Sequence, residues 1–499
     1  MSRTGSAVAG IAAAALAAAA GQLVALVVNP AAAPIVAVGA AIVDRVPTPL
    51  KEWAVATLGT ADKAVLIGTV VLGVAVLSAI AGVLAVRRAG VGYGVFAAVG
   101  LVGVLAAATR PASGPLDWLP SIVGTAVAMG VLRLELRWLA DRPGQEPDTR
   151  RGIDRRVLLT GAAGVVAVGA AAAVSGGTVE PTASTPVAIP TAATPAPALP
   201  AGLEATVPDV SPLRTPIEDF YRIDTALALP RVSTDTWTLQ VDGMVAAPYK
   251  ITWAELLAMP MIERDITLTC VSNPIGGPYC GSTRFLGVRV ADLLRRAQPD
   301  AAADQVLSSS VDGFTASTPL AVLLDGRDAM IAIAMDGQPL TQVHGFPARL
   351  VTPGLYGYVG ATKWLNRLKV STFAADEAYW TQRGWSEMGP VKTATRIDTP
   401  QERIAPGTTV IAGVAWATHR GVGKVEVQVD NGPWVAAKLG PDVGLDYWRQ
   451  WYLPWDAPAG PHRLSARASD ASGLPQIAEV QDVLPDGATG YHVVEVTVG

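Results

Sequence analysis

The chain has 499 residues, a length that allows about three domains of roughly 150 residues each. Half of the residues are hydrophobic, 16% are charged and the mean hydropathy is +0.35, which excludes a disordered chain and disfavours a wholly soluble enzyme. The net charge of −4 lacks the basic excess of nucleic-acid-binding proteins, so no nucleic acid is expected as a partner.

The apolar excess is concentrated in long runs without charge. A membrane-spanning helix needs ~20 apolar residues, and the shorter fourth run reaches that length if its charged end extends to the interface. Within the first run, residues 31–43 are too short to span and are interpreted as re-entrant or interfacial. These runs predict an all-α membrane domain of about five helices over residues 1–179. The runs are Thr4–Val43, Ala64–Val86, Ala89–Thr109, Trp118–Leu132 and Val157–Val179.

Arginines in the short loops indicate the orientation of these helices. Arg3 precedes the first run, Arg87 and Arg88 separate the second and third runs, and seven arginines lie between residues 133 and 156. Arginine-rich loops thus alternate with loops that are poorer in Lys and Arg. This alternation predicts an N-terminus inside the cell and everything after residue 179 outside the cytoplasmic membrane. A cleaved signal peptide over the first run is the alternative.

Two arginines precede the last apolar run. Arg155-Arg156 resembles a twin-arginine export signal, although it is internal. That route carries folded proteins, which suits a domain that binds its cofactor before export. Simple positive-inside anchoring is the alternative reading of the same pair.

Residues 180–210 are rich in Pro, Ala and Thr and are predicted to be an extended linker that buries little. The next segment, 211–389, mixes short strands and short helices without a regular βαβ rhythm, which favours an α+β domain. No G-x-G-x-x-G or P-loop is present, so nucleotide binding has no support. The predicted strands cover 237–245 and 263–270. The predicted helices cover 252–257, with Thr252 and Glu255 as a capping box, and 290–297.

Residues 390–499 form short alternating strands separated by turn residues. Regular spacing of such strands over about 100 residues predicts an immunoglobulin-like β-sandwich, here without a stapling Cys pair. The predicted strands include 408–415, 425–429 and 462–468, and five tryptophans supply core or interface area.

Cys270 ends a predicted strand and opens a loop of small and turn residues. Such a position is typical of a reactive or metal-binding side chain. Two alternatives remain open from composition alone. One is a buried free cysteine, and the other is a Cys270–Cys280 disulfide on the outer face of the membrane.

Several ordered motifs in residues 211–499 resemble the sulfite oxidase family of molybdopterin enzymes. The last hundred residues look like that family's immunoglobulin-like dimerisation domain, whereas the helical half shows no comparable motif. The matching motifs are Phe220-Tyr221-Arg222, LTCVSN, STRFLGVRVADLL and MDGQPLTQVHGFPARLVTPGLYGYVGATKWLNRLKV. In LTCVSN, Asn273 matches the last residue of the family's Cys-Ala-Gly-Asn, and Val-Ser replaces Ala-Gly.

The resemblance implies a Mo–molybdopterin cofactor and assigns roles to individual residues. Cys270 matches the thiolate that ligates molybdenum, a soft ligand that metal binding keeps deprotonated. Arg222 and Lys363 match cations beside the metal and the substrate pocket, and His344 and Arg349 match the pair that holds the pterin phosphate. Further candidates for cofactor binding are Tyr221, Asp224, Asn273, Asp312, Ala361 and Thr362.

These residues also have ordinary structural readings. His344 would then be a satisfied core histidine, Arg349 and Lys363 surface ion-pair partners, and Asp312 a turn residue. One position departs from the family: Trp385 stands where sulfite oxidases place a tyrosine near the metal. Tryptophan offers a larger apolar wall and one N–H donor but no phenolic hydroxyl, which questions sulfite as the substrate.

The sequence predicts no haem of its own, because it has no Cys-x-x-Cys-His and no histidine before His344. We therefore expect a membrane-anchored molybdenum oxidoreductase that transfers an oxygen atom and two electrons. Its expected partners are a small-molecule substrate, a separate cytochrome or quinone system and the membrane, with a homodimer possible through the sandwich. The alternatives are a reductase of S- or N-oxides and, in another class, a cofactor-free surface-binding protein.

Overall fold

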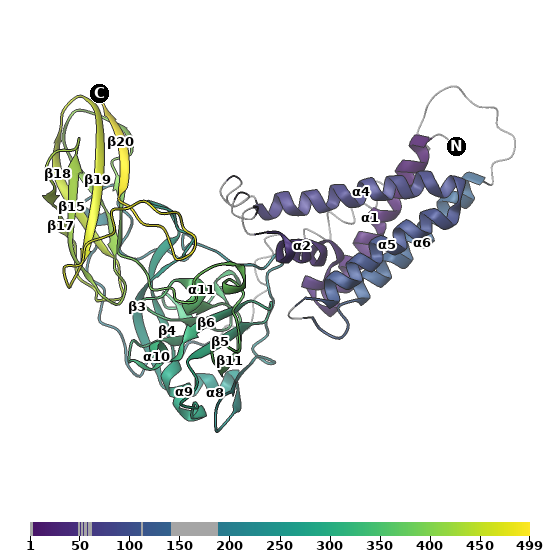
Figure 1. Ribbon diagram of the computed structural model, residues 1–499, viewed down its shortest axis with the longest axis horizontal. Coiled ribbons are helices and arrows are strands. Elements are labelled where there is room, and N and C mark those ends of the chain that lie inside the picture. The colour runs from purple at the N-terminus through teal and green to yellow at the C-terminus, as the bar shows by residue number, and fades with distance from the viewer. Residues whose placement is uncertain are drawn as a thin grey trace. The chain divides into compact units, whose positions relative to one another are not determined.

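The computed structural model of the chain describes residues 3–47, 50, 53, 57, 62–110, 113–140 and 188–499 (Figure 1). The chain falls into two compact units. The first consists of Met1–Pro186 with Thr225–Pro230, and the second of Val187–Asp224 with Arg231–Gly499. Helices build the described part of the first unit, and sheets with short helices build the second.

Three helices of the first unit are long and apolar enough to cross a membrane: Thr4–Val28, Lys63–Arg87 and Ala89–Ala108, among the residues searched. The helices are α1 (Arg3–Val28), α2 (Pro34–Arg45), α4 (Asp62–Arg87), α5 (Ala89–Ala108) and α6 (Leu119–Ala140). The predicted fourth span lies in α6, which contains Arg133, Glu135 and Arg137 and is not among the three. The predicted fifth span and Arg155-Arg156 lie outside the described residues, so the count of five stays a prediction.

Two glycines allow α1 and α4 to pack closely. A side chain at Gly10 would collide with the backbone carbonyl of Ser78, and one at Gly82 with that of Ser6. Small residues at such a crossing let helix backbones approach, which is how apolar helices gain packing energy where no hydrophobic effect drives them together.

Two sheets form the α+β part of the second unit. One has the order β2-β1-β11-β5-β6, in which only β1 and β11 run parallel. The other has the order β10-β9-β7-β4-β3 with β8 beside β7. The first sheet contains β1 (Thr238–Gly243), β2 (Tyr249–Thr252), β5 (Gln305–Ser310), β6 (Thr315–Pro319) and β11 (Leu365–Ser371). The second contains β3 (Met261–Thr269), β4 (Cys280–Arg289), β7 (Met330–Met335), β8 (Gln338–Pro339), β9 (Arg349–Val351) and β10 (Ala361–Thr362).

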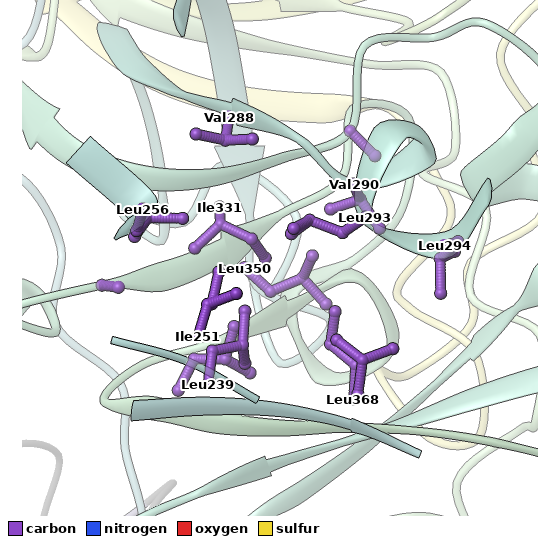
Figure 2. Close-up of a cluster of buried hydrophobic side chains, with 14 of the residues drawn as sticks. Leu239, Ile251, Leu256, Val288, Val290, Leu293, Leu294, Ile331, Leu350 and Leu368 are labelled. Atoms are coloured by element: carbon purple, nitrogen blue, oxygen red, sulfur yellow. The ribbon is translucent and has the colours of Figure 1, made fainter. Parts of the chain in front are cut away.

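One apolar core joins both sheets to short helices (Figure 2). Leu239 and Leu368 from the first sheet meet Ile331 and Leu350 from the second, and all four are fully buried. The helices are α8 (Trp253–Leu257), α9 (Val290–Ala297) and α10 (Leu320–Leu324). The short helix α11 (Gly357–Gly360) belongs to another apolar cluster, through Tyr358 and Val359. The capping box of Thr252 and Glu255 is present, which confirms that local prediction.

Two further sheets pack face to face at the C-terminus around a core that includes Ile411, Trp451 and Leu464. The structure confirms the predicted strands, since they lie within β14, β15 and β19, while the immunoglobulin type stays a prediction. One sheet contains β12 (Ala394–Thr399), β14 (Gly407–Trp416), β18 (Arg449–Ala457) and β17 (Lys438–Leu439). The other contains β13 (Glu402–Ile404), β20 (His492–Val498), β19 (Gly460–Asp470), β15 (Val422–Val429) and β16 (Val435–Ala436).

The described part of the predicted linker, residues 188–210, packs against the second unit. Thr194 bridges to Ile262 in parallel, and Ala193 N donates to Met261 O at 2.8 Å, so the segment covers the edge strand β3. Val207 and Val210 are buried against the sandwich. Apart from these two valines the stretch is exposed or partly exposed, as expected for an extended segment that buries little, whereas its attachment to the edge of β3 and to the sandwich was not predicted.

The crossing of α1 and α4 generates a stability prediction. Gly82→Leu should lower the midpoint of thermal unfolding of the full chain in detergent, because overpacking costs roughly 1–3 kcal/mol. Gly73→Leu is the matched control in the same helix, since a side chain there meets nothing within 4 Å. Equal midpoints for the two variants would contradict the close crossing.

Candidate functional site

Cys270 stands directly after β3, at the start of a loop that returns to β4. We call residues 270–279 the Cys270 loop. Cys270 N donates to Tyr279 O at 3.0 Å, and Asn273 closes the loop by accepting from Tyr279 N at 2.8 Å and donating to Cys270 O at 3.1 Å. The Cys270 Sγ lies 3.0 Å from Ser272 Oγ. The Cys270 pKa is raised, mainly by burial, so the thiol is protonated in this environment.

Cys280 has a different environment. Its Sγ lies 3.3 Å from Thr269 Oγ1 inside the core, and burial raises its pKa to about 11. Both cysteines are free. The alternative of a Cys270–Cys280 disulfide is therefore wrong for this structure, and Cys280 fits the role of a buried core thiol.

His344 and Arg349 lie close together. His344 ends a 3-10 turn (Gln342–His344), and Arg349 begins β9 of the second sheet. Arg349 is buried, with Nη1 donating to His344 O at 3.3 Å and with no hydrogen-bond partner for Nε among the described residues. Burial lowers the pKa of Arg349 to about 10. Burial and the Arg349 charge lower the pKa of His344 to about 4, so the imidazole is neutral.

Three charged side chains form a second group nearby. The Asp224 carboxylate, 3% exposed, accepts from Lys363 Nζ at 2.7 Å and from Arg222 Nε at 2.9 Å. Lys363 Nζ also donates to Val343 O at 3.1 Å. Burial lowers the pKa of Lys363 to about 8 although Asp224 opposes the shift, and Arg349 and Arg222 add to it. The site therefore holds more cations than this one carboxylate balances.

Aromatic rings connect these groups. The Tyr221 ring stacks on Phe220 at 5.4 Å between centroids and faces Tyr279 at 6.4 Å, and Phe220 meets the His344 ring edge-on at 5.8 Å. Burial and the Cys270 thiol raise the pKa of Tyr221, while Arg349 lowers it, so Tyr221 lies near both. A cavity of about 610 Å³ opens here, with Phe220, Arg222 and His344 in its wall.

Trp385 is buried in an apolar cluster that also contains Val271, the residue after Cys270. Its ring meets Tyr358 at 5.8 Å and Trp380 at 6.2 Å between centroids. Trp385 is thus a packing residue of this cluster, and its part as an apolar wall beside the metal stays a prediction.

The remaining candidates have local roles. Asp312 Oδ1 accepts from Phe314 N at 3.1 Å in the turn between β5 and β6, as the turn reading expects. Thr362 Oγ1 lies 2.7 Å from Ser308 Oγ in the core, and Ala361 pairs with Val351 in β10. Sequence reasoning assigned no role to Ser272 and Tyr279 of the Cys270 loop, because only the folded loop brings Ser272 Oγ against Cys270 Sγ and the Tyr279 ring against Tyr221.

An anionic group fits the surroundings of Arg349. A guanidinium in the interior is costly without a counter-ion, and no ion pair of Arg349 occurs within the part of the chain that the structure describes. A phosphate would satisfy the orphaned Nε, with the neutral His344 as a neighbour. The Cys270 thiol supplies a soft ligand at the other side of Tyr221. The residues present thus fit the molybdenum–pterin group that the resemblance implies.

Comparisons with known proteins agree with this fit. Residues 226–380 match the family model described as "Oxidoreductase molybdopterin binding domain". The chain is 28% identical over 290 residues to human mitochondrial sulfite oxidase, covering 48% of this chain and 52% of that protein. It is 30% identical over 179 residues to a nitrate reductase of Oryza sativa subsp. japonica, covering 30% of this chain and 19% of that protein.

The chain spans about half the length of the sulfite oxidases that it matches. A shorter relative is covered more fully: the "Uncharacterized oxidoreductase YuiH" of Bacillus subtilis is 31% identical over 153 residues, which are 31% of this chain and 74% of that protein. The chain therefore belongs to the family of molybdopterin-binding oxidoreductases that includes the sulfite oxidases.

Proposed function

We propose that the protein is a membrane-anchored molybdenum-dependent oxidoreductase of sulfite oxidase type. The observation that carries the proposal is the buried Arg349 guanidinium, which has an orphaned Nε and no carboxylate partner among the described residues. An interior cation of this kind lowers the stability of the fold, and an anion bound beside it would offset that cost. The cofactor of this family carries a phosphate, and a thiol suited to its metal, Cys270, lies close to Tyr221.

Separate residues of the chain bind the metal and the phosphate. Cys270 holds the metal as a thiolate, while Asn273 keeps the loop closed around it. Arg349 and His344 hold the phosphate, and Tyr221 packs between the two ends of the site. When bound, the molybdenum–pterin group supplies a centre that exchanges an oxygen atom and two electrons with the substrate.

Arg222 and Lys363 bind the negatively charged oxygens of the substrate. Asp224 ties both side chains and sets their positions. A sulfite-like anion suits a site in which two cations share one carboxylate, since each cation keeps further N–H groups that can donate to the anion. Charge-assisted hydrogen bonds to such an anion are roughly twice as strong as neutral ones.

A reductase of S- or N-oxides is the second candidate. The aromatic cluster of Trp385, Tyr358 and Trp380 favours it, because a dry apolar wall accepts an organic substituent that sulfite lacks. The relative from Oryza sativa is named a nitrate reductase, which shows that reduction of an oxidised nitrogen occurs among the chain's relatives. A cofactor-free surface-binding protein would leave the Arg349 charge unexplained.

The three apolar helices and the arginine distribution support a multi-pass anchor in the cell membrane, with the second unit on the outer side. Electrons then pass to or from a separate cytochrome or quinone system, and the sandwich provides a surface for a homodimer. All residues proposed for the site belong to the second unit.

The two cysteines provide a matched test of the metal ligand. Cys270→Ser should abolish turnover of sulfite with a soluble artificial electron acceptor and should lower the molybdenum content, because an alcohol is a poor ligand for a soft metal site. Cys280→Ser should leave both quantities near wild type. Full activity of the Cys270 variant would disprove the assignment.

Arg349 provides the test of cofactor retention. Arg349→Met removes the buried charge but keeps the apolar volume, so it should reduce bound pterin and molybdenum at least about tenfold while the chain folds at least as well as wild type. Arg367→Met, at a partly exposed arginine paired with Asp242, is the control. Pterin fluorescence after acid release measures retention, and an unchanged yield for Arg349→Met would contradict the phosphate role.

Arg222 tests the charge of the substrate. Loss of one cation from a partly desolvated site should cost roughly 2–4 kcal/mol of transition-state stabilisation, which is roughly a 30- to 1000-fold fall in kcat/KM. Arg222→Met should show this fall with sulfite and a much smaller one with a neutral sulfoxide. Arg295→Met, at an exposed helical arginine, should change neither. Equal losses for both substrates would mean that Arg222 positions the cofactor instead.

A further inference from the structure

We propose that the C-terminal sandwich is the clamp that fixes the Cys270 loop, and that Arg396 of β12 is its central positioning residue. The inference rests on the proposed function only in the role given to Cys270. It gives the sandwich a structural role in the active site, in addition to the dimer contact proposed above.

Arg396 joins two other segments of the chain to its own strand β12. Its Nη1 donates to Gly277 O in the Cys270 loop at 3.0 Å, its Nη2 donates to Ser211 Oγ at 2.7 Å, and its Nε donates to Asp398 at 2.6 Å. The side chain is 13% exposed. A planar fork with fixed donor directions suits such a junction better than a flexible ammonium does.

Asp398 completes the junction. Its side chain is 7% exposed, and its second oxygen accepts from Ser211 N at 3.0 Å. Ser211 begins the segment that leads to Tyr221 and Arg222. The Arg396–Asp398 pair therefore joins the loop that bears the thiol to the segment that bears the substrate cation, through hydrogen bonds that are shielded from water.

The tip of the loop is held by His492 of β20. Any side chain at Gly276, where φ is +72°, would collide with the His492 ring. The ring itself is fixed, because its Nδ1 accepts from Ile397 N at 2.9 Å. Glycine at this position thus lets the loop backbone lie directly against an imidazole that strand β12 orients.

The base of the loop is held in the same way. Thr267, three residues before Cys270, donates its N–H to Asp446 O at 2.8 Å and accepts from Trp448 N at 2.7 Å through Oγ1. Asp446 and Trp448 precede β18 of the sandwich. The sandwich therefore holds Gly276 and Gly277 of the loop and also Thr267 in the strand that leads into it.

The test measures the loop directly in protein purified without cofactor. Arg396→Gln should raise hydrogen exchange in peptides covering residues 270–281 by about tenfold or more, since it removes charged hydrogen bonds that close the loop. Arg396→Lys keeps the charge opposite Asp398 but cannot reach all three acceptors, so exchange should rise less. Arg467→Gln, at an arginine paired with Glu426 on the same sandwich, is the matched control and should leave this exchange unchanged.

The two thiols separate a local effect from unfolding. The rate of Cys270 alkylation by iodoacetamide should rise about tenfold in Arg396→Gln, while Cys280 stays unreactive in the core. Unchanged exchange and alkylation would overturn the clamp. A rise at both cysteines would also overturn it, because Arg396 would then stabilise the whole unit rather than the loop. Since no cofactor is present, failure here is distinct from failure of the proposed function.

Discussion

The site depends on one electrostatic constraint, a positively charged side chain placed in the protein interior without a balancing carboxylate among the residues that the structure describes. Arg349 starts a buried strand, so it cannot turn outward without breaking the β7–β9 pairing. The surrounding groups do not relieve the charge, because His344 is neutral and Lys363 is a further cation. The fold thus keeps an anion-binding position at a cost in stability that a bound phosphate would offset.

The other side chains of the site come from segments far apart in the chain. The strand pair β3–β4 brings Cys270, the segment after Ser211 brings Tyr221 and Arg222, and Asp224 bonds to Lys363 from 139 residues away. Such a site requires that several loops be fixed at once. The sandwich contributes to this because it bonds to the Cys270 loop and to Ser211.

Sequence patterns correctly predicted those helices and strands whose formation depends mainly on residues close to one another in the chain. The capping box at Thr252, helix 290–297 and the strand that ends before Cys270 agree with the structure because each depends on neighbours along the chain. The attachment of residues 188–210 to the edge of β3 was not predicted, because an available strand edge is a tertiary feature. The sequence also could not predict that Arg349 Nε lacks a hydrogen-bond partner among the described residues, since this depends on how the interior is assembled.

The most direct test is a crystal structure of the full chain with its cofactor bound, with anomalous data collected at the molybdenum absorption edge. The account predicts one strong peak per chain at bonding distance from Cys270 Sγ, with the pterin phosphate against Arg349. A peak elsewhere, or a loaded protein whose phosphate lies away from Arg349, would contradict the assignment of the buried guanidinium as the cofactor's counter-ion.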